Sequence, residues 1–291
     1  FLRAFFGDEE VKRVFLAEDK FPKGLGLPRE DHERLACAHF SRKAQVGPLC
    51  ERWGFVDKSH NTFTLSQLEL KIVLKLAMFN WHNPDLPGGP VLSPWQNASR
   101  LLFAARIVTC VKERRLTRVL PVHKWALPFH CGERSIDDFE GVEFSDDHLA
   151  VVADQVKQLY DSQEKRHFEE LFDAALAGNP EAMALLREML VVIKFARLWN
   201  VTAGNVLFVG PYVIAFVDTE KQSRGRDDQY FFMRKMDYIL GNINAGCGSL
   251  AETLTRTPED AERLRLCFML FVAGEDDSVE ALVWNLGRYR S

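Results

Sequence analysis

The chain has 291 residues, of which 47% are hydrophobic and 27% charged, a composition typical of globular proteins that excludes disordered and fibrous classes. A chain of this length can bury a substantial core without help from metals or disulfides. The 37 Lys and Arg residues against 41 Asp and Glu leave a formal charge of −4, so total charge does not indicate a nucleic-acid or membrane partner.

Helix-start residues and apolar periodicity predict at least eight helices. The first two are expected at about residues 8–19 and 29–43. Thr64 and Gln67 match a capping box, which predicts a third helix that continues to Phe79.

The next helix has a strong start signal, with Ser93 as N-cap and Pro94 at the first helical position. A short extended piece is expected from Arg118 to Val122, and a further helix at about 145–177. The remaining helices are expected to start at Asn179-Pro180 and Thr257-Pro258, and to occupy about 227–243 and 277–288.

Strand signals are concentrated at about residues 205–217, where β-branched and aromatic residues flank Gly210-Pro211. This pattern predicts a β-hairpin. Because an isolated hairpin is marginally stable in water, it should pack on helices or find a third strand. The expected fold class is therefore mostly α, a multi-helix globular protein with one small β-hairpin element.

Two long irregular segments, at 80–94 and 121–145, interrupt the helices. The second segment separates a basic stretch from an acidic one. It divides the chain into an N-terminal helical region, 1–130, and a C-terminal helical region, 131–291, that contains the hairpin. A single compact domain is the alternative.

Six cysteines are scattered along the chain, and Cys37, Cys110 and Cys267 lie in apolar helical contexts where a free thiol acts as a small hydrophobe. The pattern predicts an intracellular reducing compartment, either the cytoplasm or an organelle matrix after removal of a targeting peptide. No apolar stretch reaches the roughly 18 charge-free residues that span a bilayer, so we expect no membrane insertion.

A catalytic thiol is the first chemical candidate, because Cys131 and His130 lie in the second irregular segment. Adjacent side chains rarely point at one another, so the base would be another histidine, such as His123. No family signature surrounds Cys131, and a loop cysteine without catalytic function is the favoured reading.

Metal and phosphate sites fail spacing tests, so we expect no metal and no cofactor. Cys37 and His39 point away from each other on a helix and cannot readily share a zinc ion with Cys50. Asp218 and Glu220 lack the strand spacing of a metal-dependent nuclease.

The glycine-rich segment 241–249 is the one candidate for a phosphate-binding loop. It follows a predicted helix instead of a strand, and it has no Walker lysine. It is therefore expected to be a helix C-cap and connector.

Charge segregation is the most interpretable feature. Six basic residues against Glu113 alone give residues 100–118 a net charge of +5, whereas residues 133–147 carry −6. Solvated or mutually facing segments are the simplest explanation. The sharper explanation is a polyanion-binding surface, made of Lys112, Arg114, Arg115, Arg118, Arg224 and Arg226.

These observations favour a helical interaction or scaffold subunit of a larger assembly, with protein partners and with RNA or another polyanion held by the basic segments. The competing hypothesis is an enzyme, either a cysteine-nucleophile hydrolase or transferase or a metal-dependent nuclease. The sequence favours a non-enzymatic role, because no catalytic constellation satisfies its spacing requirements.

Overall fold

The computed structural model describes residues 54–58, 62–67, 72–77, 94–128, 149–160, 164–219 and 239–291. The chain divides into two compact units, each built from separate stretches of sequence. Unit 1 takes residues 1–101, 123–155 and 222–230, and unit 2 takes residues 102–122, 156–221 and 231–291. The expected boundary between residues 130 and 131 lies outside the described residues.

Unit 1 contains a five-stranded antiparallel sheet with the strand order β2-β3-β4-β7-β6. Its strands are β2 (Gly54–Lys58), β3 (Thr62–Gln67), β4 (Ile72–Ala77), β6 (Lys124–Pro128) and β7 (Leu149–Asp154).

The predicted helix from Thr64 to Phe79 is wrong, because β3 and β4 occupy most of that range and pair from Thr62 opposite Ala77 to Gln67 opposite Ile72. Apolar residues at 72, 74 and 76 fit a strand period as well as a helical one, and pairing with neighbouring strands decides the outcome.

The helix predicted at about 145–177 is also wrong over its first half. Residues 149–154 form β7, and a helix begins only at Lys165. The Val-rich segment of β7 is inserted between β4 and β6, where both of its edges are hydrogen-bonded. β-branched residues favour that setting.

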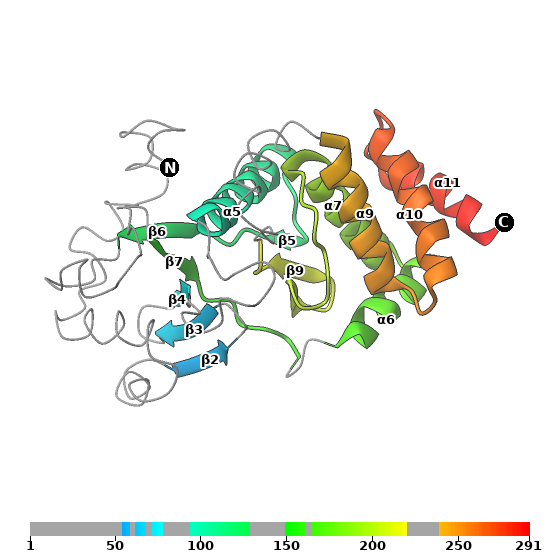
Figure 1. Cartoon of the computed structure of the whole chain (residues 1–291). Coiled ribbons are helices and arrows are strands. Elements are labelled where there is room, and N and C mark those ends of the chain that lie inside the picture. The colour runs from blue at the N-terminus through cyan, green and yellow to red at the C-terminus, as the bar shows by residue number, and fades with distance from the viewer. Residues whose placement is uncertain are drawn as a thin grey trace, which may run out of the picture. The chain divides into compact units, whose positions relative to one another are not determined.

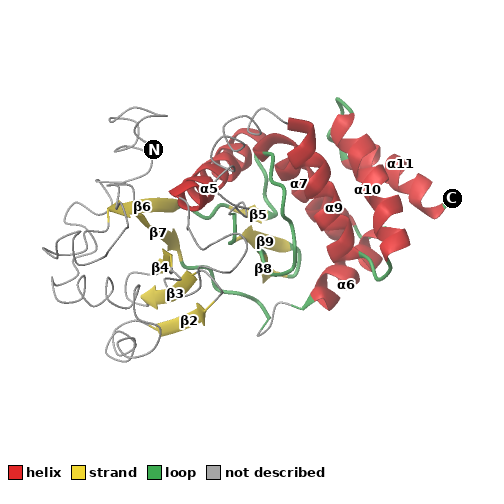
Figure 2. Cartoon of the chain, viewed as in Figure 1, coloured by secondary structure: helices red, strands yellow, loops and turns green. Residues whose placement is uncertain are grey.

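Unit 2 is mainly helical and contains a three-stranded sheet, from which α10 and α11 are the more distant helices (Figures 1 and 2). The described helices are α5 (Pro94–Arg114), which begins in unit 1, α6 (Lys165–Leu176), α7 (Pro180–Ala196), α9 (Ile239–Leu254), α10 (Pro258–Ala273) and α11 (Val279–Arg290). The strands are β5 (Val119–Leu120), β8 (Val206–Gly210) and β9 (Val213–Phe216).

The three-stranded sheet confirms the predicted hairpin and its third strand. β8 and β9 pair antiparallel, and β5 pairs parallel to β9, with Val119 opposite Ile214. β5 is the short extended piece expected near Arg118 to Val122.

Side-chain caps confirm the predicted starts of α7 and α10. Asn179 accepts the backbone N–H of Glu181 at 2.9 Å, and Thr257 accepts that of Asp260 at 3.1 Å. Each capping residue is followed by a proline at the first helical position. The proline has no N–H, and the capping side chain accepts an N–H of the first turn, so fewer donors are left without a partner.

The prediction that the glycine-rich segment 241–249 is a connector is wrong, since the segment lies inside α9. Gly246 is needed there for close packing: a Cβ on this residue would overlap the backbone oxygen of Leu198. Glycine in this helix therefore permits close approach of another chain segment.

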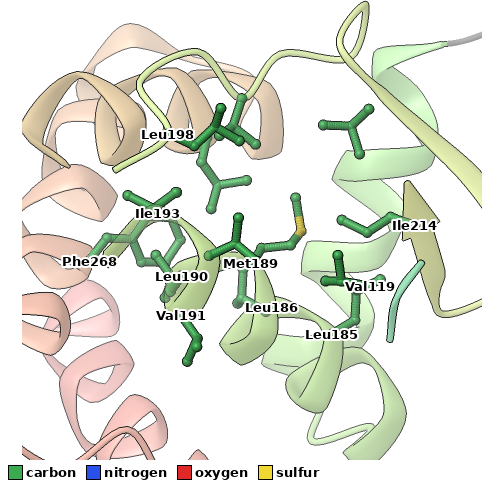
Figure 3. Packing of buried hydrophobic residues seen from close by; sticks show 14 of the residues in the cluster. Val119, Leu185, Leu186, Met189, Leu190, Val191, Ile193, Leu198, Ile214 and Phe268 are labelled. Atoms are coloured by element: carbon green, nitrogen blue, oxygen red, sulfur yellow. The ribbon is translucent and has the colours of Figure 1, made fainter. Parts of the chain in front are cut away.

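The core of unit 2 is built around α7. Met189, Leu190 and Ile193 of this helix are completely buried. Figure 3 shows this cluster between Ile214 of the sheet on one side and Phe268 of α10 on the other. Each such side chain contributes about 1.5–3 kcal/mol through removal from water.

Helices account for most of the described secondary structure, which confirms the mostly α fold class with a small β element. The five-stranded sheet of unit 1 was not expected from the sequence. Within the described ranges, no helix has the length and apolar character needed to cross a bilayer. The helices predicted at 8–19 and 29–43 lie outside the described residues.

Candidate functional site

Four of the six candidate polyanion-binding residues lie where α5 ends and β5 begins, and we call residues 112–118 the basic turn. α5 ends at Arg114, and Arg115 adopts a left-handed conformation with φ of 51°. The N–H of Leu116 then donates to the carbonyl of Val111 at 3.0 Å, which closes the helix end. Glycine is the usual residue in this conformation. For arginine, steric contact between Cβ and the backbone makes the left-handed conformation unfavourable by about 1 kcal/mol.

A buried carboxylate from α7 holds the next part of the basic turn. Glu188 has 4% exposure. Its two oxygens accept the backbone N–H groups of Thr117 at 3.0 Å and Arg118 at 2.7 Å. Because both oxygens are bonded, the burial cost of this charge is offset and the backbone of the turn is fixed.

Arg118 is engaged in contacts within unit 2 through both its side chain and its backbone. Its guanidinium forms an ion pair with Glu181 in the first turn of α7. Its carbonyl accepts the N–H of Ile214 at 2.9 Å and so begins the β5–β9 pairing. Arg118 therefore joins three elements of unit 2, and its charge is largely neutralised.

Arg114 is also engaged within unit 2. Its guanidinium lies 3.5 Å from the centre of the Phe195 ring, and Nη1 lies 3.8 Å from Oδ2 of Asp277. Asp277 also accepts the Nζ of Lys194 at 2.6 Å. Half of the predicted binding residues in the basic turn thus have acidic partners in the same chain.

Lys112 and Arg115 are different, since both are exposed and neither forms an ion pair within 4.0 Å with any residue that the structure describes. Lys112 lies in the last turn of α5 and Arg115 directly follows it. The dipole of a helix favours cations at this end. They are the two cations of the basic turn that remain available to an outside anion.

The acidic partners of the basic turn come from unexpected places. The sequence suggested that residues 133–147 could face the basic stretch, but that segment lies outside the described residues, as do Arg224 and Arg226. The observed partners are Glu181 and Asp277. Sequence reasoning missed these two and Glu188. Only Glu188 has a recognisable signal, as the single acid among the mostly apolar residues 185–193.

The cysteine-nucleophile candidate is described only in part, because His130 and Cys131 lie outside the described residues. His123 lies in unit 1 directly before β6. Its Nδ1 lies 3.2 Å from Oδ2 of Asp154, the last residue of β7, and its side chain is half exposed. A carboxylate in this position orients an imidazole, which is one requirement of a histidine base.

The three described cysteines are free and buried, which does not favour a reactive thiolate. The sequence predicted this environment for Cys110 and Cys267. Burial raises the pKa of Cys110 to about 11 and that of Cys247 to about 12. The Cys110 thiol donates to the carbonyl of Val191 at 3.9 Å. These thiols behave as small apolar side chains.

The remaining metal candidates are not assembled in the described part of the chain. Cys37, His39, Cys50 and Glu220 lie outside it, whereas Asp218 lies within it. Among the described residues, no group of three or more His, Cys, Asp or Glu side chains is placed to hold a metal ion.

A groove of about 270 Å³ opens beside the start of α10 and contains a second group of cations. Arg256 pairs with Glu169 and Asp173, and Arg265 pairs with Glu262. These acids neutralise the groove, so it lacks the available charge of the basic turn.

No family model matches this chain, and no curated protein matches it. Its functional assignment therefore depends on its own residues and their geometry.

Proposed function

We propose that this chain is a helical interaction subunit of a larger assembly and that it holds RNA through the basic turn. The main support is that Lys112 and Arg115 are exposed and form no ion pair among the described residues. The backbone of the turn that carries them is hydrogen-bonded to buried Glu188. A fixed turn presents cations without the entropy cost of ordering a loop at the moment of binding.

The expected contact uses side chains alone. The basic turn is at the negative end of the α5 dipole, and the N–H groups of Thr117 and Arg118 already donate to Glu188. No backbone donors of these two residues remain for a phosphate. Binding should therefore be electrostatic, insensitive to base sequence and strongly weakened by salt.

The salt dependence can be estimated from the number of available cations. Two phosphate contacts on a single strand correspond to a slope of about −1.4 in a plot of log affinity against log salt concentration. Arg114 and Arg118 would steepen the slope if RNA displaced Asp277 and Glu181. A measured slope thus reports whether the intramolecular ion pairs open.

The test is fluorescence anisotropy of labelled single-stranded RNA at several salt concentrations. The double variant Lys112→Glu/Arg115→Glu should weaken binding by at least about tenfold. The control Lys157→Glu/Arg290→Glu reverses two other exposed cations and gives the same net charge; its affinity should stay within about twofold of the parent.

Absence of binding at low salt would contradict the proposal, as would an equal loss in the test and control variants. Capture of an acidic protein by the same two cations, with no RNA binding, would assign the basic turn to a protein partner and overturn the RNA assignment.

A cysteine-dependent enzyme is the second candidate, and the contact between His123 and Asp154 favours it. If His123 activates Cys131, the rate at which iodoacetamide labels Cys131 should fall at least about tenfold in His123→Ala. Peptide mass spectrometry measures this rate residue by residue. An unchanged rate would remove the enzyme candidate.

A further inference from the structure

The outer face of α11 carries a short stripe of three exposed residues. Glu280, Trp284 and Arg288 are four residues apart, so they follow one another along the same side of the helix. Trp284 is 64% exposed, the largest exposed fraction among the large apolar side chains of the described residues. An exposed tryptophan between opposite charges is an unusual feature for a solvated helix face.

The two charges of the stripe cannot neutralise each other within the helix. Glu280 and Arg288 are separated by eight residues, or about 12 Å along the axis. The Arg288 guanidinium lies 4.2 Å from the centre of the Trp284 ring. Neither charge has an ion pair within 4.0 Å in the described part of the chain.

The charges are placed symmetrically about the tryptophan. Glu280 precedes Trp284 by one helical turn, and Arg288 follows it by one turn. Turning the stripe end for end therefore exchanges a negative position for a positive one. Such a surface is complementary to a second copy of itself in the antiparallel direction.

We propose that α11 pairs antiparallel with α11 of a second copy of this chain about a two-fold axis near Trp284. In this arrangement the two tryptophans pack together at the centre. Each Glu280 then meets Arg288 of the second copy, so one contact repeated twice satisfies all four charges.

Exposed apolar side chains on α11 and on the helix packed against it strengthen the proposal. Four of the six exposed large apolar residues among the described residues lie on α10 and α11, namely Leu266, Leu270, Val283 and Trp284. The two helices pack side by side (Figure 1). A concentration of exposed apolar side chains on one helical pair is typical of an interaction surface, and tryptophan and arginine are the residue types most often decisive in interfaces.

The test is the mass of the full chain by sedimentation equilibrium over a range of concentrations. The parent chain should form a concentration-dependent dimer. Glu280→Arg and Arg288→Glu should each abolish it, because each places like charges opposite each other twice. Trp284→Ala should raise the dissociation constant by at least about tenfold.

Mixing the two charge variants tests the antiparallel pairing directly. When Glu280→Arg and Arg288→Glu are combined in equal amounts, both contacts become attractive again, so a mixed dimer should form. The double variant in one chain should also dimerise. Glu252→Arg and Arg290→Glu are the controls, since Glu252 lies on α9 and Arg290 lies off the stripe; both should dimerise like the parent.

A monomer at every concentration would overturn the proposal. A dimer that persists in both single charge variants would do so too, because it would use another surface. If the parent dimerises, each single variant is monomeric and the mixture fails to dimerise, Glu280 does not meet Arg288 of the second copy and the antiparallel register is overturned.

Discussion

The carboxylate of Glu188 accepts the backbone N–H of Arg118 at 2.7 Å, from inside the core of unit 2. Its other oxygen accepts the N–H of Thr117 at 3.0 Å. A residue with no exposed charge of its own therefore determines how exposed cations are presented. The backbone of the basic turn therefore depends on a buried residue of α7 as well as on its own hydrogen bonds.

Replacing Glu188 with Gln should destabilise the protein. The amide supplies one acceptor but places an NH₂ donor opposite a second N–H donor, which leaves one partly buried backbone N–H unsatisfied. The expected loss in unfolding free energy is about 1–3 kcal/mol. Urea denaturation measures it, and Glu252→Gln on the exposed side of α9 should change stability by no more than about 0.5 kcal/mol.

The ion pair between Lys194 and Asp277 should be worth more than an exposed pair. Both side chains are less than one-fifth exposed, and the 2.6 Å contact is supplemented by donation from Lys194 to the carbonyl of Gly274. A double-mutant cycle should give a coupling energy of about 1.5–3 kcal/mol. The same cycle on exposed Arg256 and Asp173 should give about 0–1 kcal/mol; equal couplings would show that the partial burial has no effect.

Two helical glycines should respond to alanine with opposite signs. Gly246→Ala places a methyl group against the backbone oxygen of Leu198 and should cost about 1–3 kcal/mol, because backbone must shift. Gly287→Ala in α11 meets no atom within 4 Å. It should stabilise the helix by about 0.5–1 kcal/mol. Thermal unfolding of the two variants beside the parent checks both signs.

Alkaline pH should destabilise the fold through its buried thiols. Burial raises the pKa of Cys110 from 9.0 to about 11 and that of Cys247 from 9.0 to about 12. The unfolded chain loses these protons first, so their contribution is fully present below pH 9 and declines as pH rises toward 11 and 12. Stability measured by urea denaturation should fall across this range.

The same pKa values predict slow alkylation. A two-unit rise lowers the thiolate fraction of native Cys110 about 100-fold at pH 8, before steric protection is counted. Peptide mass spectrometry after brief iodoacetamide treatment, with and without urea, should show this protection. Rapid labelling of native Cys110 would mean that α5 and α7 separate readily at this contact.

Local signals predicted the parts of the fold that local chemistry determines. Asn179 and Thr257 cap helices with their own side chains, so the starts of α7 and α10 follow from a few adjacent residues. The β-hairpin follows in the same way from two strand-forming runs around Gly210-Pro211.

The errors arose where distant partners decide the structure. β4 is a strand because it pairs with β3 and with β7, which is more than seventy residues away in sequence. Gly246 lies within α9, where the close approach of the Leu198 backbone leaves no room for a Cβ. Neither partner is visible in the local sequence pattern, so periodicity and glycine content favoured the wrong elements.

The candidate site shows the same division. Helix-end cations and charge runs identified Lys112, Arg114, Arg115 and Arg118, but the sequence did not distinguish their environments. Glu181 and Asp277 neutralise two of them and leave the other two available. That distinction depends on ion pairs that span more than sixty residues of chain.

The bond between Glu188 and Arg118 also has a consequence for the time at which the site forms. Seventy residues separate the two partners, and contacts of such long range form only after a large loop has closed. During synthesis, the turn after α5 leaves the ribosome well before α7 can supply its carboxylate. A nascent chain would therefore carry its cations on an unorganised segment and would acquire a shaped binding surface only once α7 has docked.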